Sequence, residues 1–103
     1  MKIVISTSHG GFRLSEDVLK YMGIPYIVTD YEAIPSVAID SLEFRTNPKL
    51  IEFIEAFGSE CASGKWANLQ IEEIPKGTLF RIQEYDSAEW IETSDDIDWW
   101  IAT

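Results

Sequence analysis

The sequence has little cysteine, histidine and positive charge, and each shortage excludes a class of protein. A single cysteine, Cys61, cannot form an intramolecular disulfide, which excludes a disulfide-stapled scaffold and favours a reducing compartment. With one cysteine and one histidine, His9, the chain cannot build a zinc centre without carboxylate ligands. No apolar run approaches the roughly 18 residues that span a bilayer, and the chain opens on a strand pattern instead of a targeting peptide. We therefore expect a cytoplasmic protein.

Positive charge is scarce because the chain carries eight Lys and Arg against eighteen Asp and Glu, a net charge of −10. Such a field repels nucleic acid and anionic membranes and attracts basic protein surfaces. It argues against direct nucleic-acid or membrane binding and predicts a protein partner with a basic surface. Most of the excess lies after residue 81, where acids occur without a base: Glu84, Asp86, Glu89, Glu92, Asp95, Asp96 and Asp98.

Apolar residues are abundant enough to build one folded domain. Hydrophobic residues make up 46% of the 103 residues and aromatic residues 13%, so the chain has core material despite its charge. No internal repeat, low-complexity tract or linker divides it. We expect a single domain over residues 1–103, and the composition is compatible with a homo-oligomer.

The first half of the chain predicts a strand, a helix and a second strand. Residues 3–5 are a short apolar run, as in a strand buried on both faces. Ser15 is placed to cap a helix that ends at Gly23, and residues 24–29 form the next strand pattern. Residues 30–40 have no clear period and are expected to form a loop or an irregular edge segment.

The second half predicts a helix followed by antiparallel strands. Asn47 is a good cap and Pro48 suits the first helical position, so a helix begins there. Residues 67–74 alternate as a half-buried strand, and residues 79–85 and 89–93 flank a turn as a hairpin. The expected fold is α+β, with two helices on a mixed, largely antiparallel sheet of about five strands.

Several short motifs follow one another along most of the chain. They are Lys2-Ile-Val-Ile, Gly10-Gly11-Phe12-x-Leu14-Ser15, Arg45-x-Asn47-Pro48-x-Leu50-Ile51, Glu73-Ile74-Pro75 and Glu84-Tyr85-Asp86-x-x-Glu89-Trp90. In this order they resemble a functionally uncharacterised family of small phage and prophage proteins. The resemblance implies a phage source and no particular mechanism. The acidic end of this chain departs from the family, in which that end is often basic, and indicates a partner surface particular to this member.

A glycine loop before the first helix is a candidate ligand site. Glycine lets a backbone approach an anion closely, and the first N–H groups of a helix have no intrahelical partner. The pattern matches neither a P-loop nor a dinucleotide fingerprint, and a tight structural turn needs the same glycines. The residues that would bind a phosphate or nucleotide are Ser8, His9, Gly10, Gly11 and Arg13.

Catalysis and metal binding lack a recognisable set of residues. His9 would have to be base, acid or ligand, and although a triad with a nearby serine and Asp30 can be drawn, nothing places these residues together. The run Asp95-Asp96-x-Asp98 is too short for a calcium loop and lacks its central glycine. We therefore expect a protein that is not an enzyme and that uses neither a cofactor nor a metal.

Tryptophans among the C-terminal acids form a candidate partner site. Neighbouring side chains of a strand face opposite ways, so Trp99 and Trp100 cannot both enter one core. An aromatic side chain ringed by carboxylates suits the anchoring of a basic partner. The alternative is packing on both faces of a small sheet or under a dimer contact. The predicted partner site comprises Trp90, Trp99, Trp100 and the acids named above.

These features favour binding over catalysis. The leading hypothesis is a phage-encoded, non-enzymatic inhibitor of host defence, an anti-CRISPR protein or similar, acting in the host cytoplasm. Its acidic surface would mimic nucleic acid and dock on a basic groove of a host nuclease or CRISPR effector. The alternatives are a small-ligand binder that captures a nucleotide or phosphate at the Gly10-Gly11 loop, and a weak hydrolase that uses His9.

Overall fold

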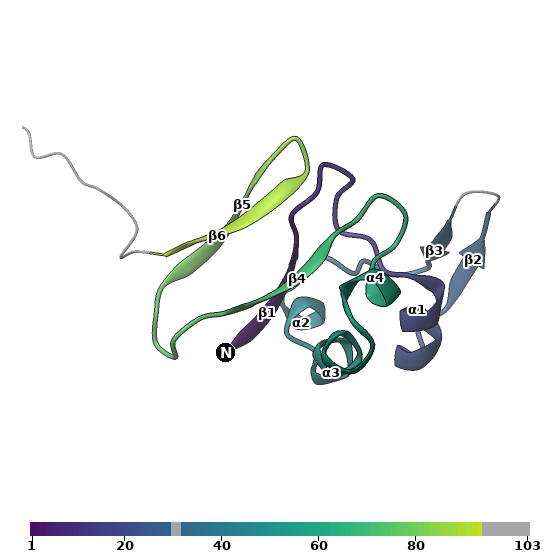
Figure 1. Ribbon diagram of the computed structural model, residues 1–103, viewed down its shortest axis with the longest axis horizontal. Helices are drawn as coiled ribbons and strands as arrows, with labels where there is room; N and C mark the ends of the chain where they lie inside the picture. The colour runs from purple at the N-terminus through teal and green to yellow at the C-terminus, as the bar shows by residue number, and fades with distance from the viewer. Residues whose placement is uncertain (30–31, 94–103) are drawn as a thin grey trace, which may run out of the picture.

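The computed structural model describes residues 1–29 and 32–93, which adopt an α+β fold (Figure 1). The strands of these residues form three separate antiparallel pairs, β1–β4, β2–β3 and β5–β6. The prediction of one mixed sheet of about five strands is therefore wrong, although the α+β class stands. In chain order the elements are β1 (Lys2–Ser6), α1 (Glu16–Met22), β2 (Tyr26–Val28), β3 (Ala33–Pro35), α2 (Leu42–Arg45), α3 (Pro48–Phe57), α4 (Ser59–Ala62), β4 (Leu69–Glu73), β5 (Phe80–Tyr85) and β6 (Ala88–Thr93).

Strand β1 lies in the middle of the fold and is buried on both faces, as its apolar run predicts. Val4 belongs to the main core, which it shares with residues of α1 and α3 such as Val18 and Leu50. Successive side chains of a strand point to opposite faces, so Ile3 and Ile5 face away from that core. They are nevertheless buried, and β6 lies against β1. Figure 1 shows the helices on one side of the β1–β4 pair and the β5–β6 hairpin on the other.

Two helices begin where their capping residues predict. The Ser15 hydroxyl accepts a hydrogen bond from the Val18 N–H at 3.3 Å, and α1 ends at Gly23, whose φ of 71° is the left-handed conformation that glycine tolerates best. The Asn47 side chain accepts from the Lys49 N–H at 2.9 Å, and Pro48 occupies the first turn of α3. These local signals hold because they depend on neighbouring residues alone.

Within residues 30–40, expected to form a loop or an irregular edge segment, the described part is residues 32–40, which includes a short regular strand. It contains β3, which pairs with β2 so that Ile27 lies opposite Ile34, and its end carries the buried Ile39. The pair is short and largely exposed, so it shows no alternation that would reveal it in the sequence. The four-residue helices α2 and α4 were also not predicted, because a single turn is too short to display a helical period.

A buried ion pair joins α2 to the hairpin. Arg45 and Glu89 have side chains only 5% and 10% exposed, and two nitrogen–oxygen contacts of 2.7 Å join them. Arg45 also donates to the backbone carbonyls of Asp40 at 2.7 Å and Val4 at 3.3 Å. Glu89 in turn accepts from the Ser6 N–H at 2.8 Å. The pair therefore holds α2, β1 and β6 together at one point.

Removing either charge of this pair should destabilise the protein strongly. Breaking a buried pair leaves an unpaired charge and typically costs about 3–5 kcal/mol. We expect the free energy of unfolding, measured by chemical denaturation, to fall by this amount in Arg45→Met and in Glu89→Gln. In the double variant it should fall by clearly less than the sum of the two single losses. The exposed pair Arg81 and Glu92 is the matched control, where the same substitutions should cost at most about 1 kcal/mol. Additive losses at Arg45 and Glu89 would contradict a coupled pair.

Candidate interaction site

The glycine loop and the hairpin turn, both predicted as functional, meet in space. Nδ1 of His9 lies 2.9 Å from the carbonyl oxygen of Asp86, which can only accept, so Nδ1 donates this hydrogen bond. The carboxylate of Asp86 is 3.7 Å from the same nitrogen. On its other side the loop is held by the Ser8 hydroxyl, which donates to the carbonyl of Trp66. The two regions form one continuous surface.

Both glycines of the loop have structural reasons to be glycine. A Cβ atom on Gly10 would lie 2.1 Å from the carbonyl oxygen of Trp66, so no side chain fits there. Gly11 has a φ of 85°, in the left-handed region. The backbone of the loop therefore requires both glycines whether or not an anion binds there.

The guanidinium of Arg13 is already bonded to other groups of the protein. Its guanidinium forms an ion pair with the carboxylate of Glu32, and its Nε donates to the carbonyl of Gly10 at 2.9 Å. A phosphate at the loop would have to compete with Glu32 for this cation. The nucleotide hypothesis stays a prediction, but Arg13, the cation named for that site, is already engaged by Glu32 and Gly10.

The acids of the hairpin fall into two groups. Glu89 is engaged with Arg45, and Glu92 accepts from Arg81 at 3.1 Å and from Gln83 at 2.7 Å. These hydrogen bonds, that from Arg81 first, lower the pKa of Glu92 below its ordinary value. Glu84 is exposed, and the side chain of Asp86 is 81% exposed. Of the predicted partner-site acids, Glu89 is therefore not accessible to a partner, whereas Glu84 and Asp86 are accessible carboxylates; Glu84 stands directly opposite Glu89 and lies on the same face of the hairpin.

Aromatic side chains lie on the outer face of the same hairpin. Trp90 stands opposite Gln83 and is 47% exposed, and Tyr85 stands opposite Ala88 and is 76% exposed. The alternation of the strands puts Trp90 and Tyr85 on one face, while Glu89 lies on the other. The hairpin thus exposes aromatic area on this outer face, while the exposed carboxylate of Glu84 lies on the other face and that of Asp86 lies in the turn.

A depression of about 330 Å³ lies between the loop, the hairpin and the segment before α2. Its lining includes Gly11 and Phe12 from the loop, Glu84 from the hairpin, and Arg45. The ring of Phe12 lies 4.3 Å from the Arg45 guanidinium, a cation–π contact. The positive group at this depression is therefore already paired with Glu89 and stacked on Phe12.

The tail residues of the predicted partner site, Asp95, Asp96, Asp98, Trp99 and Trp100, lie outside the described residues. Within residues 1–29 and 32–93, no group of three or more His, Cys, Asp and Glu side chains could hold a metal ion. None of the described helices is long and apolar enough to cross a membrane.

Sequence reasoning missed the role of Arg45. A buried arginine in a one-turn helix has no periodic signature, and the acidic pattern does not distinguish its partner Glu89 from the other acids of the hairpin. One signal was available, because both residues belong to the short motifs quoted above.

Comparisons with protein-family models, with curated proteins and with solved structures each found no match.

Substituting Gly10 should disturb the contact with Trp66. Overpacking of this kind typically costs about 1–3 kcal/mol, and the carbonyl of Trp66 must move to admit a Cβ atom. We expect Gly10→Ala to lower the melting temperature and to shift the indole N–H resonance of Trp66. Gly77→Ala is the control, since a Cβ atom there meets nothing within 4 Å and only a φ of 89° opposes it. An unmoved Trp66 resonance in Gly10→Ala would contradict the close approach.

The lowered pKa of Glu92 should depend on Arg81. We expect a carbon-detected NMR titration to give Glu92 a pKa below 4.5, and the Arg81→Met variant to bring it back towards that value. Because the pKa is lower in the folded protein, the pair stabilises the fold above the unfolded pKa, and this contribution is lost as pH falls through the folded pKa. A Glu92 pKa that is the same in both proteins would exclude the ion pair in solution.

Proposed function

We propose that this protein is a phage-encoded, non-enzymatic inhibitor of host defence that docks an acidic surface on a basic groove of a host nuclease or CRISPR effector. The phage source rests on the motif resemblance. The mode of action rests on charge, because a surface with a large negative excess attracts basic surfaces and speeds encounter with them.

The observation that carries the proposal is that most of the basic residues are paired with acids of the same chain. Five of the eight are engaged in ion pairs with the chain's own acids, so they offer little positive potential to a partner. They are Lys2, Arg13, Lys20, Arg45 and Arg81. Acids without an ion pair in the described part of the chain, such as Glu43, Glu60 and Glu84, then dominate the surface potential.

The hairpin supplies the most suitable docking element. Tyr85 and Trp90 expose their rings on one face of the hairpin, Asp86 lies in the turn next to Tyr85, and Glu84 is exposed on the other face. Interfaces draw much of their energy from such aromatic anchors. The ion pair between Arg45 and Glu89 fixes the hairpin against β1, which limits the entropy lost when a partner binds. Charge would then bring the partner close, and the aromatic residues would hold it.

Phage plating tests the proposed function directly. The protein should be expressed in bacterial strains that carry an active CRISPR or restriction system, and a targeted phage plated on them. We expect plating to rise towards that of strains without the defence system. Unchanged plating against every system of the panel would reject the proposal.

Neutralising the hairpin acids should slow association with the inhibited effector. We expect a lower on-rate for Glu84→Gln with Asp86→Asn, since steering charges act mainly on association. Asparagine tolerates the φ of 49° at residue 86, so the turn should persist. Glu43→Gln with Glu60→Gln removes the same charge from α2 and α4 and is the matched control. Equal slowing in both double variants would point to net charge without a local docking face.

Stoichiometry separates a blocking protein from an enzyme. A binding inhibitor should saturate near one copy per effector site, and His9→Ala should preserve inhibition, because His9 only donates to the hairpin turn. Removing a positioned general base would instead cost about 10² to 10⁴ in rate. Inhibition at well below one copy per site that disappears in His9→Ala would overturn the non-enzymatic mechanism.

A further inference from the structure

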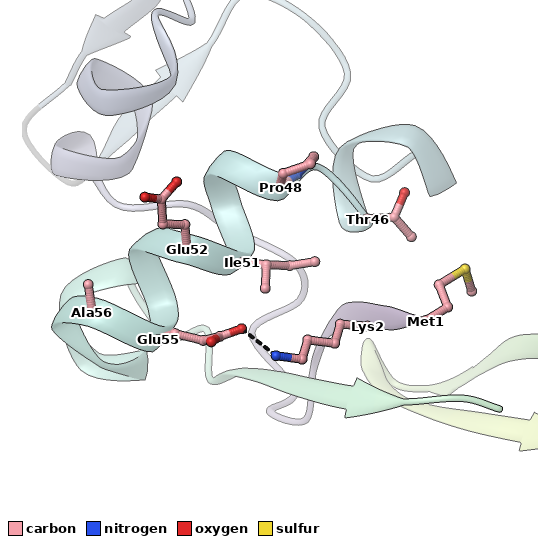
Figure 2. Close-up of a pocket in the computed structure, with 8 residues that line it drawn as sticks. All are labelled: Met1, Lys2, Thr46, Pro48, Ile51, Glu52, Glu55 and Ala56. Atoms are coloured by element: carbon pink, nitrogen blue, oxygen red, sulfur yellow. Dashed lines mark hydrogen bonds and ion pairs between the residues drawn. The ribbon is translucent and has the colours of Figure 1, made fainter. Parts of the chain in front are cut away.

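A groove lies at the Met1 end of β1, at the far end of this strand from the glycine loop. It has a volume of about 660 Å³ and is formed by the start of β1, by α3 and by Thr46, which caps the C-terminal end of α2. Figure 2 shows the side chain of Ile51 directed towards β1, with Pro48 and Met1 further along the groove. These side chains give the groove an apolar floor.

The rim of this groove is acidic. Nζ of Lys2 lies 2.8 Å from a carboxylate oxygen of Glu55, and both side chains are about half exposed. The hydrogen bond and the charge of Glu55 raise the pKa of Lys2, so this lysine stays charged and neutralises one carboxylate. Glu52 also lines the groove and has no ion pair among the described residues. Glu73 stands directly opposite Lys2 across the β1–β4 pair. The rim therefore carries three carboxylates against two positive groups, the Lys2 ammonium and the N-terminal ammonium of Met1, which donates to the Ile74 carbonyl at 2.7 Å.

We propose that this groove binds a basic, amphipathic segment of the partner protein, which makes it a second contact area besides the hairpin. An apolar side chain of the segment would cover Ile51 and Pro48, and a lysine or arginine next to it would reach Glu52 and share Glu55 with Lys2. The inference rests on the proposed function in one respect, that the partner is basic. Charge selects this occupant over a second copy of the chain, because each copy carries a net charge of −10 and like charges repel.

Lys2 gives the proposal a sharp test, since it competes with the incoming cation for Glu55. Replacing Lys2 by Met keeps an apolar stem and removes the competing charge, so binding of a cationic segment should become tighter. Replacing Glu52 by Gln should weaken it by about two- to fivefold, the size expected for one exposed ion pair. A residue with a purely structural role would not produce these opposite effects.

The experiment uses a capped Arg-Leu-Leu-Arg peptide and NMR shift mapping on the full chain. We expect shifts that cluster at Lys2, Ile51 and Glu52, tighter binding to Lys2→Met, weaker binding to Glu52→Gln, and unchanged binding to the control Glu60→Gln. A Gln-Leu-Leu-Gln peptide and an Arg-Ser-Ser-Arg peptide should both bind more weakly, because the groove uses charge and apolar contact together.

Three results would overturn the proposal. Shifts spread over all acidic surfaces would mean unspecific attraction. Equal binding of the Arg-Ser-Ser-Arg peptide would show that the groove makes no apolar contact with the segment. Shifts that grow with protein concentration in the absence of peptide would assign the groove to a second copy of the chain. The outcome is independent of the plating test. Peptide binding without any effect on plating would reject the proposed function and keep the groove, and the reverse pattern would reject only the groove.

Discussion

The ion pair between Arg45 and Glu89 is the interaction on which the arrangement of this protein depends. It brings together a one-turn helix, the central strand and the hairpin, three elements that are far apart in the sequence. Two buried charges are costly to remove from water, and the pair is favourable only because further hydrogen bonds satisfy both partners. Backbone groups of Asp40, Val4 and Ser6 supply those bonds.

This arrangement explains how three small strand pairs form one fold. A two-stranded hairpin is marginally stable by itself, so β5–β6 needs a surface to pack on. Ile3 and Ile5 provide buried apolar area next to β6, and the ion pair fixes the position of the hairpin along β1. The same contact directs Glu89 inward and leaves Trp90 on the outer face, so the packing of the hairpin determines which residues a partner can reach.

The parts of the fold that could be predicted from the sequence are those governed by neighbouring residues. Ser15 and Asn47 cap helices through bonds to residues two or three positions away, and the hairpin turn at residues 86–87 follows from its flanking strands. How the strands combine depends on long-range contacts, which periodicity does not reveal. The acids of the hairpin show the same limit of sequence patterns. Glu84 and Glu89 occur in the same acidic pattern, and only the position of Arg45 makes Glu89 buried while Glu84 is exposed.

Native-state hydrogen exchange tests the central claim that the buried ion pair holds the hairpin in place. The amides of β5 and β6 should be compared with those of α3 in the wild-type protein and in Glu89→Gln. If the pair fixes the hairpin, protection of the β5 and β6 amides should fall by more than that of the α3 amides. An equal fall in both regions would mean that the pair stabilises the whole domain without a particular role at the hairpin, and would contradict the account.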